Sequence, residues 1–297
     1  MHRRRRYVGD HILTEKDVSA EGRFDDLVTY GGWTMDDHPP GGMNWPGPPA
    51  HHHPSPSPFG IPYRCLYSRN IANLFCAGRN ISATHAAMSA TRVMATCAVI
   101  GQAVGTAAAV AHRDGLIPRE VYDERIGELK QTLMEDDCYL PWNVRRVSPL
   151  TREAELTASE GDPEPLRSGV DRPVEGEDNK WVGKPGSWVQ YRFDGPRRLR
   201  RLRMVFDSDL NRPQGDMGHY RPLHIEARGV PETLLRAFRI EVLDQKNQWR
   251  VIERVENNYQ RLVRMVIDAE SSAIRFMPEA TWGAAQVSLF AWDVDGQ

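Results

Sequence analysis

Apolar residues in the first half of the chain recur at helical spacing. A stretch of small, apolar residues over positions 89–112 predicts a buried helix, and Gly115 predicts its end, since glycine commonly follows the last helical residue. Pro118 predicts the start of a second helix over residues 119–135, whose apolar positions fall on one stripe. The first half therefore contains at least one pair of consecutive helices.

Two glycines stand inside the first of these helices. Gly101 and Gly105 are four residues apart, so they share one helix face. A face without side chains lets another backbone approach closely. We therefore expect tight packing against this face.

Shorter elements precede the helices. Thr14 predicts the N-cap of a short helix, with Asp17 in its first turn. Residues 38–62 are dominated by proline, glycine and histidine, which predicts a long irregular loop. Residues 71–77 form an apolar run that predicts a buried strand, and residues 78–80 predict a turn after it.

Alternation of apolar and polar residues dominates the second half. Residues 238–242 alternate before a polar turn at 244–248, which predicts a hairpin with residues 249–251. Further strands are predicted at residues 187–193, 201–206, 262–267, 273–276 and 286–294. Many short strands with polar connections and almost no helix indicate an antiparallel β-sandwich.

These patterns divide the chain into two parts. Residues 1–150 predict an α/β segment and residues 151–297 an all-β module, with a linker rich in Glu, Asp, Pro, Gly and Ser at 150–180. A length of 297 residues suits two domains.

Composition excludes several classes of protein. The formal net charge is -2, which argues against a nucleic-acid-binding protein that works through bulk charge. Four cysteines without a CxxC pair indicate buried thiols, with neither a zinc ribbon nor a disulfide scaffold. The stretch at 93–111 contains polar residues, so we interpret it as a buried helix and not as a membrane span. The arginine run at 3–6 has no apolar region behind it and is no secretory signal.

Four consecutive motifs in the first half carry a family resemblance. They are IPYRCLYSRNI at 61–71, NLFCAGRNISATH at 73–85, SATRVMATC at 89–97 and GQAVGTAAA at 101–109, with YGGW at 30–33 and DHP at 37–39 before them. Over residues 3–110 the chain closely resembles the C-terminal cofactor-binding segment of FAD-dependent oxidoreductases with the glutathione-reductase-type flavin fold. The resemblance implies a substrate-side segment and then an FAD-binding strand, turn and helix at 71–112.

That resemblance assigns roles to the turn and the helix start. The turn lies beneath the cofactor, where Gly78 permits close backbone approach. Arg79 meets a phosphate or the substrate, or else forms a surface salt bridge. The start of the helix stabilises negative charge at the edge of the reduced flavin, or else is an ordinary helix cap. The implied FAD contacts are Ala77, Gly78, Arg79, Asn80, Ser82, Thr84, Thr91, Arg92, Val93 and Met94.

Two histidines are candidates for catalysis. Removal of hydride from an alcohol needs a base, and histidine is a side chain that commonly serves as one, which makes His38 and His85 the candidates. Either one is alternatively a structural, hydrogen-bonded histidine. Tyr63 and Arg64 are candidates for substrate contact.

One part of the FAD site is missing from the sequence. Proteins with this fold open with a GxGxxG fingerprint, and the chain contains none. We therefore expect Met1 to be an internal methionine of a longer enzyme, or the missing half to reside on a separate dinucleotide-binding chain. In either case we expect this chain alone to be inactive.

The second half is similar to discoidin-like, galactose-binding-like modules. The similarity rests on NKW at 179–181, the strand from Trp188 and FDSDL at 206–210. Such modules hold sugars or other polar ligands in loops at one end. Candidates for stacking on a ligand, or alternatively for the core, are Trp181, Trp188, Trp249 and Trp282.

Metal sites are not indicated by this sequence. Residues 51–53 are three histidines without a carboxylate or cysteine at ligand spacing, which favours a solvated polar tract over a metal site. Asp207 and Asp209 favour a solvated turn over a calcium site.

The resemblances together predict part of an FAD-dependent oxidoreductase. It transfers hydride to flavin from a hydroxylated substrate, which the β module suggests to be a carbohydrate. The alternatives are a glycan-binding protein with a relic flavin segment, or one subunit of a split flavoenzyme.

Overall fold

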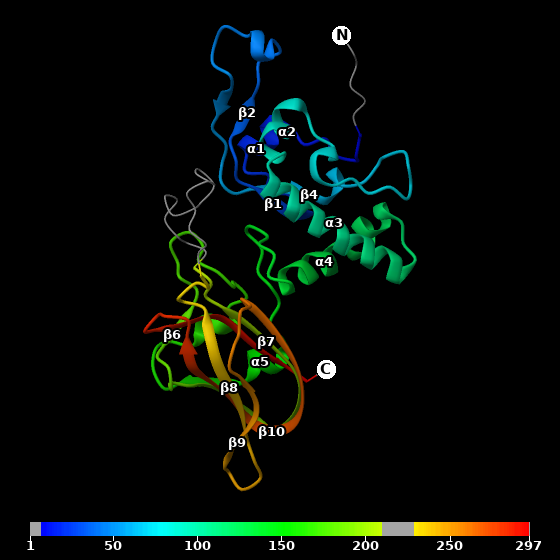
Figure 1. Cartoon of the computed structure of the whole chain (residues 1–297). Helices are drawn as coiled ribbons and strands as arrows, with labels where there is room; N and C mark the ends of the chain where they lie inside the picture. The colour runs from blue at the N-terminus through cyan, green and yellow to red at the C-terminus, as the bar shows by residue number, and fades with distance from the viewer. Residues whose placement is uncertain (1–6, 210–228, 297) are drawn as a thin grey trace. The chain divides into compact units, whose positions relative to one another are not determined.

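The computed structural model describes residues 7–209 and 229–296 (Figure 1). The chain forms two compact units, Met1–Asn143 (unit 1) and Val144–Gln297 (unit 2), each with its own core. The arginine run at 3–6 and Leu210 lie outside the described residues. Unit 1 mixes helices and short strands and unit 2 is built on an antiparallel sheet, so the predicted fold classes are confirmed.

Unit 1 carries its helices after a set of short strands. Its elements are α1 (Glu15–Ser19), β1 (Leu27–Gly31), β2 (Met35–Asp37), η1 (Gly42–Asn44), β3 (His51–His53), β4 (Phe59–Pro62), η2 (Tyr63–Cys65), η3 (Gly78–Asn80), α2 (His85–Thr91), α3 (Met94–Asp114) and α4 (Pro118–Glu135). Strand β1 pairs with β4 and β2 pairs with β3, both antiparallel.

The ends of these helices follow the sequence signals. Thr14 caps α1 in a capping box with Asp17, as predicted. Gly115 ends α3 with φ +69°, a conformation that a residue with a Cβ rarely adopts. Pro118 is the first residue of α4, where its missing N–H costs no hydrogen bond.

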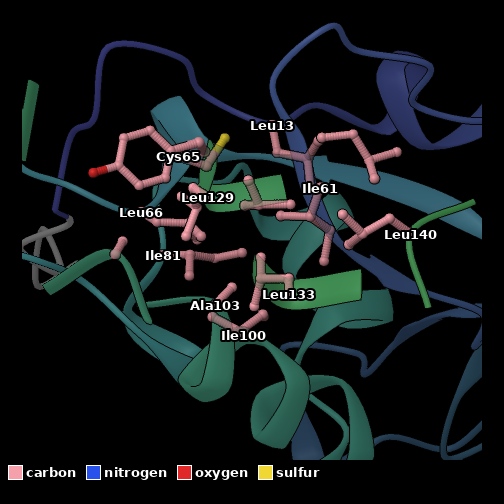
Figure 2. Close-up of a cluster of buried hydrophobic side chains, with 14 of the residues drawn as sticks. Leu13, Ile61, Cys65, Leu66, Ile81, Ile100, Ala103, Leu129, Leu133 and Leu140 are labelled. Atoms are coloured by element: carbon pink, nitrogen blue, oxygen red, sulfur yellow. The ribbon is translucent and has the colours of Figure 1, made fainter. Parts of the chain in front are cut away.

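The core of unit 1 is aliphatic where the helices meet the short strands (Figure 2). Leu129 and Leu133 of α4 lie in it with Ile100 and Ala103 of α3, and all four are almost fully buried. The predicted apolar stripe of α4 therefore faces the core, as an amphipathic helix requires.

Three predictions for unit 1 need correction. Residues 71–77 form no strand but only an isolated antiparallel bridge, Phe75 to Tyr67, beside which Cys76 N–H donates to Leu66 O at 2.7 Å. The loop at 38–62 contains strands β3 and β4, which its proline and histidine content concealed. The helix over 89–112 is two helices, since Val93 is extended at φ -69°, ψ 149°.

The glycine face of α3 also differs from its prediction. A Cβ built on Gly101 or Gly105 would have no neighbour within 4 Å, so no described backbone packs there. Among the described residues, α3 is the one helix long and apolar enough to cross a membrane, and a third of its most apolar window is buried.

Unit 2 is a single antiparallel sheet with short helical segments beside it. Its elements are α5 (Pro149–Glu153), β5 (Glu155–Ala158), η4 (Glu164–Arg167), β6 (Trp181–Gly183), β7 (Val189–Phe206), β8 (Leu235–Leu243), β9 (Trp249–Val255), β10 (Leu262–Thr281) and β11 (Val287–Asp295). The strand order is β6-β11-β7-β10-β8-β9, with β5 paired to β7. The segment at 150–180, predicted as a linker, contributes α5, β5 and η4.

Two long strands in the sheet replace four predicted short ones. Strand β7 unites the segments predicted at 187–193 and 201–206, and β10 unites 262–267 and 273–276. Register shifts at residues 266–269 and 271–273 let β10 continue along β7 through polar residues. The hairpin of β8 and β9 is confirmed.

The core of unit 2 is aromatic on one side of this sheet. It includes Trp181, Trp292, Tyr191, Phe238 and Phe276, all fully buried. Tyr191 and Trp292 stack with ring centroids 4.7 Å apart, an aromatic pair of the kind that adds to burial energy.

Four charged side chains are buried together in unit 2. Arg145 Nε lies 3.0 Å from Asp171 Oδ2, and Arg145 Nη2 lies 2.7 Å from Asp293 Oδ2. Arg203 Nη1 adds a contact of 2.8 Å to Asp171. Burial raises the pKa of Asp293 to about 6, against the opposing effect of the two arginines.

Candidate functional site

The predicted helix start is the break between α2 and α3, which we call the α2–α3 junction (residues 91–94). Arg92 ends α2, and its Nη2 donates to Asp36 O at 3.1 Å. Val93 supplies no side-chain cap for α3, and Met94, the first residue of that helix, is 89% exposed. The first N–H groups of a helix have no intrahelical acceptor. They are therefore open to an anionic or electron-rich group at this junction.

The predicted turn lies beside this junction. Gly78 has φ +62°, and a Cβ built on it would meet nothing closer than Cys97 Cβ at 3.9 Å. Cys97 is in the first turns of α3, so η3 and the start of α3 are adjacent. Arg79 and Asn80 are exposed on the same turn. The turn thus combines a left-handed glycine with open space, as close approach of a cofactor requires.

Of three other predicted FAD contacts, two have local hydrogen-bond partners and one has none among the described residues. Thr84 caps α2 by accepting from Ala87 N–H at 3.3 Å, and Thr91 Oγ1 donates to Met88 O at 3.5 Å. Ser82 is buried, and its hydroxyl has no hydrogen-bond partner among the described residues. Their contact with FAD stays a prediction.

The two candidate histidines have different surroundings. His85 is the first residue of α2, and its Nε2 lies 3.2 Å from Asp37 Oδ1. His38 Nδ1 lies 3.1 Å from Pro49 O, so it is bonded to a backbone carbonyl in the proline-rich segment. Only His85 has a carboxylate partner, which fixes one ring nitrogen as donor and leaves the other as acceptor.

A second histidine–carboxylate pair was missed by sequence reasoning. His52 of β3 lies opposite Asp36 of β2, with His52 Nδ1 2.6 Å from Asp36 Oδ1. Asp36 also accepts hydrogen bonds from Trp33 Nε1 at 2.7 Å and Thr34 Oγ1 at 2.5 Å. Partial burial favours the neutral acid, but these bonds hold the pKa of Asp36 below its usual value. The aspartates at 36–37 and the histidines at 51–53 were the available signal.

The two predicted substrate residues are engaged elsewhere. Tyr63 is fully buried and its hydroxyl donates to Pro118 O at 2.7 Å, and burial raises its pKa well above the usual value. Arg64 Nε and Nη2 each donate to Asp26 at 3.0 Å, a bidentate pair. Both side chains tie short elements of unit 1 together, and their contact with substrate stays a prediction.

The tryptophans of unit 2 divide into core and surface. Trp181 is fully buried and donates from Nε1 to Glu160 O at 2.8 Å, so it is part of the core. Trp188 and Trp249 lie on either side of Arg275. Trp282 stacks on Tyr259 at 4.6 Å, and Tyr259 is 62% exposed.

Metal ligands are not gathered in the described part of the chain. Across residues 7–209 and 229–296, no group of three or more His, Cys, Asp or Glu side chains could hold a metal ion. Asp207 Oδ2 lies 3.4 Å from Lys180 Nζ, and Asp207 Oδ1 accepts from Asp209 N–H at 2.8 Å. These contacts stabilise a turn.

The comparison of the sequence with family models gives one match, and it lies in unit 1. Residues 3–133 match the FAD dependent oxidoreductase family. The match covers less than half of the chain and includes the Gly78 turn and the α2–α3 junction. The resemblance predicted from the motifs is confirmed for residues 3–133, which we call the matched segment.

Comparison with solved structures gives similar proteins for half of the chain. The family 32 carbohydrate-binding module of Streptococcus pneumoniae EndoD covers 50% of this chain and 100% of its own, with TM-score 0.39 and 13% identity. A Clostridium perfringens module solved with GalNAc-β-1,3-galactose covers 49% and 96%, with TM-score 0.35 and 10% identity. A Streptococcus pneumoniae fucose binding module covers 50% and 94%, with TM-score 0.36 and 11% identity. Comparison with curated proteins gives no match.

Proposed function

We propose that unit 1 holds the flavin end of FAD in an oxidoreductase that removes hydride from a hydroxylated substrate. The α2–α3 junction carries this proposal, because uncapped helix N–H groups and the left-handed Gly78 turn meet there within the matched segment. When bound, FAD supplies the acceptor for the two electrons of the hydride.

The chain's own residues would stabilise the charge of the reduced cofactor and hold the cofactor and substrate in position. The N–H groups of Met94 and Ala95 at the start of α3 stabilise negative charge on the reduced cofactor. Ala77, Gly78 and Asn80 offer backbone at close approach, and exposed Arg79 offers a cation for a phosphate or an acidic substrate.

Proton transfer falls to the histidine with a carboxylate partner. His85 Nε2 donates to Asp37, which leaves Nδ1 to accept the proton of the substrate hydroxyl as hydride leaves the carbon. Asp37 stabilises the imidazolium that forms. His38, already bonded to Pro49 O, is the weaker candidate.

The adenosine end of the cofactor requires residues of another kind. No GxGxxG occurs in the 297 residues. We propose that a dinucleotide-binding segment, on a longer protein or a separate chain, completes the site.

A variant at the first position of α3 tests the role of the junction. Met94→Pro removes one N–H but preserves the helix, because proline is favoured at this position and Val93 is already extended. Met94→Ala is the matched control, since it shortens the same side chain and keeps the N–H. Titration of the full chain with FAD, followed by flavin absorbance and fluorescence, should show binding about tenfold weaker for Met94→Pro only. Equal affinity of the two variants for FAD would exclude a flavin site at this junction.

A second candidate function rests on an observation in unit 2. The stacked pair Tyr259–Trp282 is partly exposed, and the guanidinium of Arg236 lies 5.8 Å from the Trp282 ring. Trp282 Nε1 donates to Asn258 O at 2.8 Å, which fixes the indole in place. A rigid aromatic surface beside a cation suits the apolar face and hydroxyls of a sugar. We propose that unit 2 binds a glycan here.

An oligosaccharide titration of the full chain tests this second function. Tyr259→Ala should abolish the change in tryptophan fluorescence that a neutral galactose oligosaccharide produces. Val251→Ala, an exposed position on β9, should leave it intact. Binding that survives Tyr259→Ala would exclude this surface.

A further inference from the structure

The sheet of unit 2 carries an arginine between two indoles on the face away from its core. Ile274 and Phe276 of β10 are fully buried, so Arg275 between them points to the opposite face. Its guanidinium carbon lies 4.6 Å from the ring centroid of Trp188 and 3.9 Å from that of Trp249. The guanidinium is therefore within cation–π distance of two indole rings, and its N–H groups, which lie in its own plane, form the edge that can hydrogen-bond.

That edge is only partly used within the chain. Gln190 of β7 lies opposite Arg275 in the sheet, and Arg275 Nη2 donates to Gln190 Oε1 at 2.9 Å. The buried Nε of Arg275 has no acceptor among the described residues. One N–H of Nη2 and the N–H groups of Nη1 remain. Together they form a pair of donors at the end of the guanidinium that an acceptor can meet end-on.

Arg275 forms no ion pair in the part of the chain that the structure describes, although a carboxylate lies near it. Glu241 lies opposite it on β8, but the Glu241 carboxylate accepts from Arg239 Nε at 2.7 Å. Arg192 lies on the same face and has no ion-pair partner in the part of the chain that the structure describes. Burial lowers the pKa of Arg275, Glu241 opposes this, and Arg192 and Arg239 reinforce it.

We propose that this face is a binding site for a carboxylate borne on a sugar, that is, a uronate residue of a glycan. The end-on guanidinium edge of Arg275 receives the carboxylate in bidentate fashion, and Arg192 adds a second positive charge beside it. The indoles hold the guanidinium rigid before the ligand arrives, so little side-chain entropy is lost on binding. The assignment of the carboxylate to a sugar rests on the glycan-binding function proposed for unit 2, but this site is separate from the Tyr259–Trp282 pair.

Titration of the full chain with two oligosaccharides of equal length tests the proposal. One is an oligogalacturonate and the other is the neutral galactose oligosaccharide, and the heat of binding is measured at low and high salt. We expect the oligogalacturonate to bind at least about tenfold more tightly at low salt, and the preference to shrink at high salt.

Three substitutions locate the effect. Arg275→Lys keeps the charge and loses the planar fork, so it should lose about tenfold in affinity for the oligogalacturonate only. Arg192→Gln, at an exposed position that the fold does not need, should lose a smaller factor. Arg254→Gln is the control, because it removes an equal charge from strand β9 of the same sheet, where Arg254 is already paired with Glu279 at 3.3 Å.

The possible results separate this site from the other proposals. Equal affinity for the two oligosaccharides, or a preference unaffected by both Arg275→Lys and Arg192→Gln, overturns the uronate site and leaves the Tyr259–Trp282 proposal standing. An Arg275-dependent preference that persists in Tyr259→Ala supports the uronate site, even if neutral binding is lost. A changed near-ultraviolet circular dichroism of the tryptophans in Arg275→Lys would mean that this variant alters the local fold. In that case the affinity of Arg192→Gln for the oligogalacturonate alone decides whether the uronate site stands.

Discussion

In unit 1 the polar groups of the α2–α3 junction face outward, whereas in unit 2 four charged side chains are enclosed within the protein. The N–H groups at Met94 have no side-chain cap, and the two histidine–aspartate pairs are partly exposed. In contrast, Arg145, Asp171, Arg203 and Asp293 are each less than 9% exposed and compensate one another. Unpaired polar groups at a surface are available to a ligand, and paired charges inside a fold mainly fix its structure. Arg275 is an exception in unit 2, because it has no ion pair in the described part of the chain and therefore resembles the unpaired groups of unit 1.

The largest expected effect comes from breaking the enclosed network. Arg145→Met leaves Asp171 and Asp293 with Arg203 alone, so we expect unit 2 to lose about 3–5 kcal/mol of unfolding free energy. Urea unfolding of the full chain, followed by amide hydrogen exchange resolved for each unit, measures this. Arg152→Met, at an exposed position, is the control. A loss below 1 kcal/mol would mean that the network is not what fixes this part of the fold.

The stability of the chain measured at a series of pH values tests whether Asp293 of this enclosed network is buried as described. The pKa of Asp293 is raised to about 6 in the folded chain, from an ordinary value near 3.8. The folded state therefore binds a proton that the unfolded state releases between these pH values, and stability from this group falls as pH rises from 4 to 6. Relative to Asp293→Asn, we expect the wild type to lose about 2–3 kcal/mol over this range. The exposed Asp268→Asn should keep the slope of the wild type, and a parallel slope for Asp293→Asn would contradict the buried titration.

A smaller effect is expected at the first helix of unit 1. Thr14→Ala removes the side chain that accepts from Asp17 N–H at 3.2 Å, and helix capping of this kind contributes about 1 kcal/mol. Hydrogen exchange of α1 should increase, while that of unit 2 should not change. Lys16→Ala, exposed on the same helix, serves as the control. No increase would show that packing of Val18 alone holds α1.

The smallest effect is expected for a charge pair on the surface of unit 2. Arg198 Nη2 lies 3.2 Å from Asp268 Oδ1, but the side chains are 58% and 78% exposed. Solvent screening leaves such pairs with about 0–1 kcal/mol, so Asp268→Asn should shift unfolding by less than about 0.5 kcal/mol. A double-mutant cycle with Arg198→Gln measures the coupling, and a value near that of the enclosed network would remove the contrast between exposed and buried pairs.

Local signals explain which parts of the fold could be predicted. The α3 end at Gly115, the α4 start at Pro118 and the β8–β9 hairpin each depend on residues close together in sequence, and all three are confirmed. The break before α3 was missed because Val93 fits the apolar pattern of a helix while its ψ is 149°. Pattern alone does not reveal that a strand continues through a bulge, so β7 and β10 were each predicted as two.

In the candidate site, too, the features that depend on residues close together in sequence could be predicted and the others could not. Gly78 and the junction near Met94 are marked by local sequence and by family motifs. The pairing of Asp36 with His52 joins residues 16 positions apart across a proline-rich segment, and it depends on the register of β2 and β3. Likewise, the two indoles near Arg275 are Trp188, just before β7, and Trp249, the first residue of β9, so only the folded sheet brings them together.

The hydrogen bond from Trp33 Nε1 to Asp36 Oδ2 has a practical consequence. The same carboxylate holds His52, so a change of proton or partner at that histidine alters the electronic environment of the indole. The indole N–H resonance of Trp33, identified by its loss in Trp33→Phe, is therefore a native spectroscopic probe of the β2–β3 hairpin. Such a probe can detect ligands that bind near His52 before any turnover is known.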